Sequence, residues 1–519
     1  MGRPIAPRGG VPSGRFRFCK RGVLLFFLGW LIGGAWAYPR PEGVVDPLWP
    51  ERIEFLATRA PGAVPFLGLR PAELDEPRGW RAVQRLDPFS RALWRSLQAA
   101  RPAETFGFSA RGAQKLQWDS EGDLPPLPQV HLAALLRLKG GWSLFQEFRV
   151  LPVEGLYPPA PGGLTADRRV RPWDPNGVLP GAGYAADFLR AGLSYSTDSI
   201  GWKLGRFSVA WGPGWTGGLL LSDASPSLDG VLVEVRLPRV RGQMLFSVLN
   251  RLWHDEGGRR YLARRYFAAH RIDWQITPRL ELGIMDSILY GGDLRGVEWE
   301  YLNPLLPFYA AQYNNSTPTD PNFRDDNAAI GFDLRWAFRP GWAVYGELFV
   351  DDFRYSSKSN DPHALAWLIG FHHAGWRERG EVRVEYVRVG RYVYTHLVPE
   401  NQYSHYGMPL GHPLANDADR LLIVLAWWLD PSFRIEWGFH QTRKGESTLQ
   451  DRFRGEEDSD FLAGAAETRR GGFWRLIVQR RSLSGRITAY LEDVRQPDHE
   501  PGSGGVELRL SAEIGLLIP

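Results

Sequence analysis

Apolar and polar residues alternate over long stretches of the chain after about residue 130. The clearest case is AAIGFDLRWAFRPGWAVYGELFVDDF, residues 328–353. Every second residue is apolar or Gly from Ile330 to Phe338 and again from Trp342 to Val350, and the turn formers Arg-Pro-Gly lie between the two rows. Because successive side chains of a strand point to opposite faces, the pattern predicts an antiparallel hairpin with one apolar face and one polar face.

The same alternation flanks other short turns, and longer connections separate the hairpins. The further pairs of predicted strands are 272–276 with 280–284, 367–371 with 382–386, and 423–429 with 433–439. Long connections rich in Asn, Asp, Tyr, His, Gly and Pro lie near 291–326, 353–364, 391–418 and 441–471. Val506–Ile514 also alternates and is predicted as the closing strand, although the chain ends in Pro519 rather than an aromatic residue. Short turns that alternate with long loops are typical of outer-membrane barrels.

Composition supports the same architecture. Aromatic residues make up 13% of the chain, with 22 Trp, yet the mean hydropathy is only −0.29. A membrane barrel combines the two, because its outward positions are apolar or aromatic and its inward positions are polar. Only helices and closed barrels satisfy the backbone inside a bilayer, and no later segment reads as a transmembrane helix. We therefore predict an all-β fold, a large antiparallel transmembrane β-barrel of roughly 16–18 strands over 126–519.

The first 37 residues have the layout of a cleaved secretory signal. Six basic residues and no acidic ones precede an apolar run from Val23 to about Ile32, and Ala35-Trp-Ala37 follows. Without those six, 56 Lys and Arg face 58 Asp and Glu, so the mature chain lacks the basic balance of a nucleic-acid-binding protein. The one Cys, Cys19, lies inside the signal, which excludes disulfides and Cys-ligated zinc from the mature chain.

The next part of the chain, 38–125, reads as a small helical region and is the predicted periplasmic plug. Asp87-Pro88 matches an N-cap followed by Pro at the first helical position. Phe89, Leu93 and Leu97 would then share one face of a short helix. Segments near 51–59 and 71–74 are predicted as two more short helices.

Five groups of segments along the mature chain share motifs with one family. They are Gly205–Pro226 (GRFSVAWGPGWTGGLLLSDASP); Asp46–Leu56 with Leu69–Leu74; Tyr290-Gly-Gly with Glu300–Pro304 and Asp325–Asn327; Glu347–Phe353; and Glu385–Arg388 with Tyr392–His396, Tyr403–Gly407, Leu410–Pro413 and Asp417–Asp419. In this order they resemble the capsule assembly (Wzi) family of outer-membrane barrels. Each motif alone is weakly specific, whereas the ordered set is more so.

The resemblance implies an 18-stranded barrel with a helical plug at the periplasmic end, located in the outer membrane of a diderm bacterium. It also implies a lectin-like function, binding and anchoring or organising capsular or surface polysaccharide, with no catalytic residues. We expect a monomer in contact with outer-membrane lipid, with no nucleic-acid partner. The resemblance does not identify the sugar. A diffusion porin of the same architecture is the first alternative, and a barrel hydrolase that uses Ser404 and His405 is the second.

The corner Trp211-Gly-Pro-Gly-Trp215 is the first candidate site. The indole rings of Trp211 and Trp215 could stack on sugar faces. The interpretation we favour is an interfacial aromatic girdle at a strand end, with Gly and Pro turning the chain. The following Leu219–Leu221 would then begin a lipid-facing or interior-packed segment.

The long connection after residue 390 is the second candidate site. Its aromatic and histidine side chains are predicted as sugar contacts, namely Tyr394, His396, Tyr403, His405, Tyr406 and His412. The histidine spacing is not that of a zinc finger. Adjacent Ser404 and His405 are also poorly placed to act on one another as nucleophile and base. Loop histidines that only hydrogen-bond water remain the default interpretation.

A carboxylate group is the third candidate site. It comprises Asp325, Asp326, Asn327, Asp351 and Asp352, which the predicted hairpin brings to the same open end. These side chains would hydrogen-bond loop backbone and neighbouring Arg; a Ca²⁺ site is the second interpretation, since hard cations prefer oxygen ligands. An acid–base pair ranks third. We expect no cofactor beyond this open question of Ca²⁺.

Overall fold

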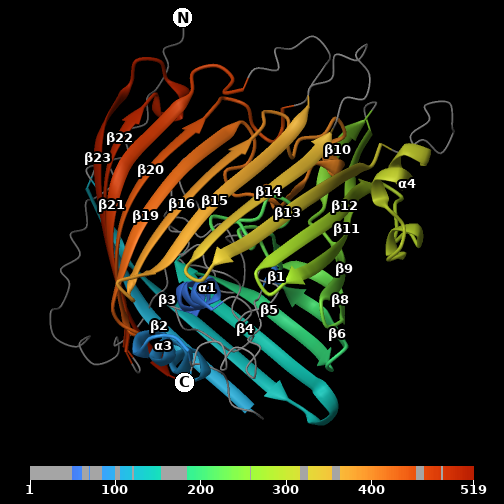
Figure 1. The fold of residues 1–519 in the computed structure, drawn as a ribbon. Coiled ribbons are helices and arrows are strands. Elements are labelled where there is room, and N and C mark those ends of the chain that lie inside the picture. The colour runs from blue at the N-terminus through green and yellow to red at the C-terminus, as the bar shows by residue number, and fades with distance from the viewer. Residues whose placement is uncertain are drawn as a thin grey trace, which may run out of the picture.

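The computed structural model describes most of the chain, and strands dominate it (Figure 1). The described residues are 49–60, 69–70, 85–99, 106–119, 122–152, 184–256, 259–315, 325–352, 363–451, 461–480 and 483–518. The predicted signal over 1–37 and the predicted helix near 71–74 lie outside these ranges. No helix in the described part of the chain is long and apolar enough to cross a membrane.

One antiparallel sheet closes on itself as a barrel. Its strands are β2 (Phe106–Asp119), β3 (Gly122–Arg137), β4 (Trp142–Pro152), β5 (Tyr184–Ser196), β6 (Ile200–Phe207), β8 (Leu228–Arg236), β9 (Val240–Val248), β10 (Leu252–Glu256), β11 (Arg259–Thr277), β12 (Leu280–Gly292), β13 (Asn327–Arg339), β14 (Trp342–Asp352), β15 (Ala364–Trp376), β16 (Gly380–Val389), β19 (Ala418–Asp430), β20 (Phe433–Lys444), β21 (Glu467–Arg480), β22 (Leu483–Arg495) and β23 (Gly504–Ile518). β23 pairs with β2, and β10 continues β9 along β11, so the described strands occupy eighteen positions around the ring.

The predicted hairpins are confirmed. β13 pairs with β14 across the turn at 340–341, and Ile330 lies opposite Val350. The predicted closing strand is also confirmed, since Ile514 in β23 lies opposite Gln114 in β2. That pairing places β2 in the barrel wall, so the barrel begins at Phe106 and the predicted boundary between 125 and 126 is wrong. Period-two alternation is hard to see in β2, because it contains several small and polar residues.

Outward and inward side chains alternate along each strand as predicted. On β11 and β12 the outward side chains Ile272, Trp274 and Ile284 are 57%, 52% and 56% exposed. Between them, the inward Arg271 is buried and donates to Asp273 at 2.8 Å and to Asp333 at 2.6 Å. A buried charge is tolerated when it is paired in this way.

The inward side chains do not face an open lumen in the described part around β11 to β20. Arg271, Glu347, Glu381, Glu385 and Arg434 are all buried there. Helices and an inserted segment occupy this part of the interior and cover the inward side chains.

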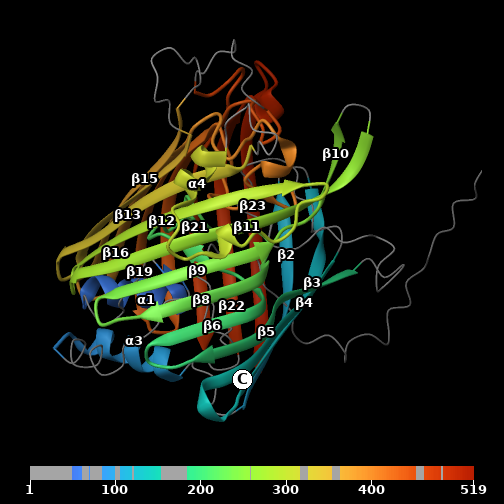
Figure 2. The ribbon, with the colours of Figure 1, turned by 90° about the vertical axis from the view of Figure 1, so that its right-hand side faces the viewer.

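The two ends of the barrel differ as predicted. Short connections at 138–141, 197–199, 237–239, 278–279, 340–341, 377–379 and 431–432 form one end. Longer ones, such as those at 208–227 and 390–417, lie at the other end. The β10–β11 hairpin projects beyond the rest of the wall at the long-connection end (Figure 2).

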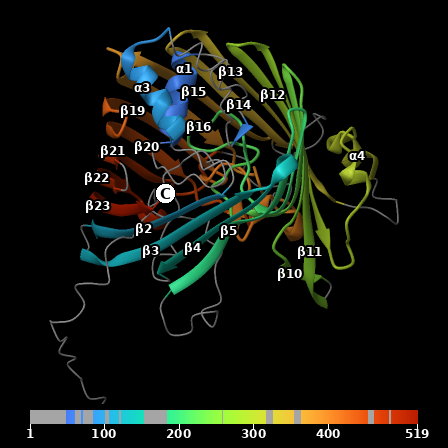
Figure 3. The same cartoon turned by 90° about the horizontal axis from the view of Figure 1, so that it is seen from below.

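Two helices lie at the short-connection end (Figures 1 and 3): α1 (Trp49–Arg59) within the barrel and α3 (Pro88–Ala99) at its mouth. The predicted N-cap of α3 is confirmed, because Asp87 accepts hydrogen bonds from the Ser90 N–H at 2.9 Å and the Ser90 hydroxyl at 2.8 Å. Burial raises the pKa of Asp87, but those bonds and the paired Arg59 guanidinium outweigh it and hold the pKa below its usual value.

Candidate functional site

The stretch between β6 and β8 folds into the barrel rather than over its rim. We call residues 208–227 the lumenal segment. Trp211, in the short strand β7 (Ala210–Trp211), pairs with Leu69 in β1 (Leu69–Arg70), and its backbone N–H donates to the Leu221 carbonyl at 2.9 Å. The side chains of Leu219, Leu220 and Leu221 are completely buried in the largest apolar cluster. The segment therefore fills part of the interior.

Two glutamates of the barrel wall hold the backbone of the lumenal segment. Glu347 on β14 accepts the Gly214 N–H at 2.6 Å and the Leu219 N–H at 2.7 Å. Glu385 on β16 accepts the Trp215 N–H at 2.6 Å and the Thr216 N–H at 2.9 Å. Carboxylates that accept several backbone N–H groups make strong, charge-assisted bonds. These contacts anchor the segment across the lumen.

The Gly-Pro-Gly corner follows from this anchoring. Gly212 has a φ of 107°, in the region that favours glycine, and a Cβ there would lie 2.3 Å from Glu347 Oε1. At Gly214 a Cβ would lie 2.5 Å from the Gly217 carbonyl oxygen and 2.8 Å from the same carboxylate. Glycine at both positions lets the backbone approach the carboxylate of Glu347, which explains why neither position carries a side chain.

A hydrogen-bonded relay joins the lumenal segment to the connection 390–417. The Leu414 N–H donates to His412 Nδ1 at 3.2 Å, so the neutral imidazole carries its proton on Nε2. That Nε2 lies 3.0 Å from the Thr216 hydroxyl, which in turn donates to Glu385. Burial, helped by Arg420, holds the pKa of His412 well below its usual value, so the ring stays neutral.

Most of the predicted sugar contacts are buried here. Tyr394 and Tyr403 stack with ring centroids 5.6 Å apart, and Tyr403 donates to the Leu220 carbonyl at 2.9 Å. His405 and His412 are 1% and 0% exposed. Tyr394, Tyr403, His405 and His412 therefore pack the connection against the lumenal segment, and they present no surface to a polymer in this conformation.

The two tryptophans of the corner have different environments. Trp211 is completely buried and donates from Nε1 to Gln243 at 2.8 Å, so the girdle interpretation is wrong for this residue. Trp215 is only partly buried, and the Arg383 guanidinium lies 4.7 Å from its ring centroid. The rings face the interior, because the segment turns inward instead of ending at the membrane boundary.

His396 and Tyr406 are the predicted contacts of the connection 390–417 that remain partly exposed. Tyr406 has a φ of 50°, its N–H donates to Asn250 at 2.7 Å, and its ring packs edge-on against His405 at 4.6 Å. A non-glycine residue in this left-handed conformation is uncommon and is often associated with a functional constraint.

The Ser404 hydroxyl does not donate its hydrogen bond to the neighbouring His405. It donates to Gln402 Oε1 at 3.0 Å, and both Ser404 and His405 are buried. The geometry gives no support to a nucleophile–base pair at this position, because the serine is engaged elsewhere and has no access to a substrate.

The carboxylate group makes structural contacts. Asp326 accepts two bonds from Arg295, at 2.8 and 3.1 Å, and one from the Tyr301 hydroxyl at 2.7 Å. Asn327 donates to the Asn401 carbonyl at 2.9 Å, and Asp351 accepts the Tyr394 N–H at 2.6 Å. Asp325 Oδ1 lies 3.9 Å from His396 Nε2, and Asp352 ends β14, where its side chain is outside the described set. Across the described ranges, no three His, Cys, Asp or Glu side chains gather closely enough to hold a metal ion.

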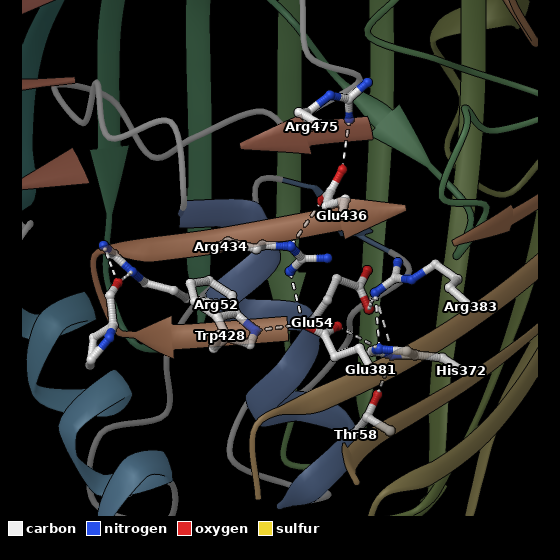
Figure 4. A network of polar contacts seen from close by, with 11 residues as sticks. Arg52, Glu54, Thr58, His372, Glu381, Arg383, Trp428, Arg434, Glu436 and Arg475 are labelled. Carbon is white, nitrogen blue, oxygen red and sulfur yellow. Dashed lines mark hydrogen bonds and ion pairs between the residues drawn. The ribbon is translucent and has the colours of Figure 1, made fainter. Parts of the chain in front are cut away.

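A polar network fixes α1 to the barrel wall (Figure 4). His372 Nε2 donates to the Glu381 carboxylate at 3.0 Å, so His372 Nδ1 accepts from the Thr58 hydroxyl at 2.9 Å. The Thr58 hydroxyl in turn accepts from Arg335. Arg434 then bridges Glu381 and Glu436 at 2.8 and 2.9 Å.

Two charged side chains in the middle of α1, Arg52 and Glu54, are also engaged. Arg52 donates to the Pro431 carbonyl at 2.8 Å, and Glu54 lies 3.9 Å from Arg383, the same arginine that covers Trp215. The plug helix and the lumenal segment thus share a wall residue. Together they occupy the described part of the interior from the short-connection end to the connection 390–417.

Comparison with known sequences identifies the family. The sequence profile of capsule assembly protein Wzi matches residues 108–504, which is well over half of the chain. The chain belongs to the Wzi family. No curated protein matches it. The family motifs include Glu347 and Glu385, the two glutamates that hold the lumenal segment, although their role could not be read from the sequence.

The solved structure of a Wzi protein shows the same fold at low identity. Wzi of Escherichia coli, described as an outer-membrane, carbohydrate-binding β-barrel involved in group 1 capsule assembly, is 15% identical, with a TM-score of 0.61 over 92% of this chain and 98% of that one. OccD3 (OpdP) of Pseudomonas aeruginosa is 10% identical, with a TM-score of 0.44 over 81% and 96%. This Wzi-family chain is an outer-membrane protein. Outer-membrane barrels in general have short connections on the periplasmic side and longer ones outside.

Proposed function

We propose that this protein binds capsular or other surface polysaccharide from outside the cell, and that it retains or organises the polymer without chemical conversion. The observation that carries the proposal is the filled interior of a Wzi-family barrel. The lumenal segment is held by four backbone hydrogen bonds to Glu347 and Glu385, and α1 is fixed below it. Function then falls to the extracellular connections.

The partly exposed face of the connection 390–417 suits a polymer of sugars. Tyr406 and His396 offer aromatic faces, and Leu397, next to His396 in the chain, is 59% exposed. The buried tyrosines and histidines beneath keep this connection in one shape, which reduces the ordering cost of binding. A single chain closes its own barrel through β2 and β23, and we propose that it acts as a monomer.

The cellular test is deletion of the gene. The proposal predicts that capsule is shed into the medium while the total amount of polymer is unchanged. Complementation with the wild-type chain should restore cell-bound polymer. Unchanged cell-bound polymer after deletion would contradict retention as the function.

Conductance in planar bilayers separates this proposal from a diffusion porin. A porin needs a continuous water-filled path, whereas the described interior is crossed by packed backbone and buried side chains. We expect the purified protein to show no large, steady conductance. A stable open channel in the wild-type protein would favour the porin and would count against the filled interior.

A further inference from the structure

The outer wall carries a covering on one side. Outward side chains of β11 and β12 are exposed in one half of the wall, as at Ile272 and Ile284, yet Tyr266, Ile288 and Tyr290 are buried in the extracellular half. The covering is the first part of the connection between β12 and β13, including α4 (Phe308–Asn315), which lies outside the ring in Figures 1 and 3. We call residues 293–315 the outer-wall segment.

Polar contacts hold the outer-wall segment against the barrel. Tyr301 and Arg295 both bond to Asp326, and the Phe308 N–H donates to the outward carboxylate of Asp286 at 2.9 Å. The Phe308 ring stacks on His270 at 4.2 Å, and His270 lies 3.2 Å from Asp286. The segment therefore shields an ionisable pair from lipid and keeps a fixed place on the wall.

The free face of the outer-wall segment is apolar. Leu294, Trp299 and Leu305 are 91%, 82% and 88% exposed. The three residues belong to a segment that packs on the lipid-facing side of β11 and β12. The apolar outer surface of the barrel therefore continues onto the segment. Exposing all three of these large apolar side chains to water would cost free energy.

Three exposed arginines of the β10–β11 hairpin lie beside this apolar face, and Asp255 is the cross-strand neighbour of one of them, Arg260. On the projecting β10–β11 hairpin, Arg264 shares the outward face with Tyr266 and is about 7 Å further from the membrane along the strand. Arg264 lies opposite Gly292, immediately before the outer-wall segment. Arg251 and Arg260 are exposed on the same hairpin, and the Arg260 guanidinium lies 4.8 Å from the ring of Trp253.

We propose that this surface binds a phosphorylated glycolipid of the outer leaflet. The guanidinium groups of Arg251, Arg260 and Arg264 would bind its phosphates, since arginine matches phosphate oxygens with paired donors. Leu294 and Trp299 would contact its acyl chains. The occupant follows from two features. The exposed arginines at the far end of β11 offer positive charge to lipid phosphates, and the exposed apolar residues belong to a segment that packs on the outer wall. The polysaccharide proposed above uses a different surface, the connection 390–417.

The test uses the full-length protein in detergent, with fluorescently labelled bisphosphorylated lipid A as the probe and fluorescence polarisation as the readout. The variant replaces Arg251, Arg260 and Arg264 with Gln. Each arginine near an anionic lipid surface strengthens binding about fivefold, so the triple variant should bind on the order of a hundredfold more weakly. The matched control replaces Arg239, Arg279 and Arg377, exposed at the periplasmic turns, with Gln, and should bind as wild type.

Two further measurements separate the explanations. Dephosphorylated lipid A should bind the wild type about as weakly as bisphosphorylated lipid A binds the triple variant, and millimolar inorganic phosphate should not displace the intact lipid. Heat-dependent migration on gels shows whether each variant is folded. If the triple variant does not fold, the single variant Arg264→Gln replaces it in the binding assay. Equal affinity of the folded arginine variant and the wild type would overturn the proposal, as would equal binding of both lipid A forms or displacement by phosphate alone.

Discussion

Replacing Glu385 with Gln should loosen the lumenal segment without changing the barrel. The carboxylate of Glu385 accepts the N–H groups of Trp215 and Thr216 and the Tyr345 hydroxyl, at 2.6, 2.9 and 2.8 Å. A glutamine is the same size but offers one acceptor oxygen, and its NH₂ group faces donors. A hydrogen bond to a charged group contributes about 1.5–3 kcal/mol, so the loss of one to two such bonds costs about 3 kcal/mol. The detached state of the segment should then be populated roughly a hundredfold more often.

Hydrogen–deuterium exchange measures this population directly. In the folded protein, peptides that contain Trp215 and Thr216 should exchange roughly a hundredfold faster in Glu385→Gln than in the wild type. Glu281→Gln is the matched control, since Glu281 is also buried on the inner wall but contacts Gln275 rather than the segment. Equal protection of 214–219 in the Glu385→Gln variant and the wild type would refute the view that wall carboxylates hold the segment in place.

Three further changes test other parts of the structure. Asp87→Ala should destabilise the start of α3 by about 1 kcal/mol at pH 7. The pKa of Asp87 is lower in the folded than in the unfolded state, so its stabilising contribution is present above the unfolded pKa and is lost as the pH falls through the folded pKa. Hydrogen-exchange protection of residues 88–92 in the wild type and the variant should therefore converge in acid. Ile369→Arg, on the outward face of β15, should cost about 2–4 kcal/mol in refolding titrations, whereas Ile369→Leu should cost little. Tyr406→Ala should weaken polysaccharide binding about two- to tenfold, and Tyr309→Ala on the outer wall should not.

The strands could be predicted because their information is local. The alternation from Ile330 to Phe338 marks a strand with one lipid-facing side whatever the rest of the chain does, and the turn at 340–341 fixes its partner. Asp87 and Pro88 likewise specify a helix start within four residues. The strand β2 could not be predicted from its own residue pattern. It belongs to the wall because it pairs with β23 where the barrel closes.

The lumenal segment and the outer-wall segment could not be predicted, because their partners are distant in sequence. Gly214 meets Glu347 from 133 positions away, and Trp215 meets Glu385 from 170 positions away. The Gly-Pro-Gly corner shows that the backbone turns there, but not that a carboxylate occupies the space. The histidines of the connection 390–417 were read as surface residues for the same reason: nothing local shows that His412 is covered by the lumenal segment.

Direct binding of polysaccharide to the purified protein tests the central claim most directly. The polymer should come from an encapsulated strain of the organism that makes this protein, and the folded barrel should be in detergent with its interior intact. The account predicts saturable binding of this polymer, with no steady conductance from the same preparation. A folded protein that leaves the polymer unbound and conducts ions steadily would contradict it.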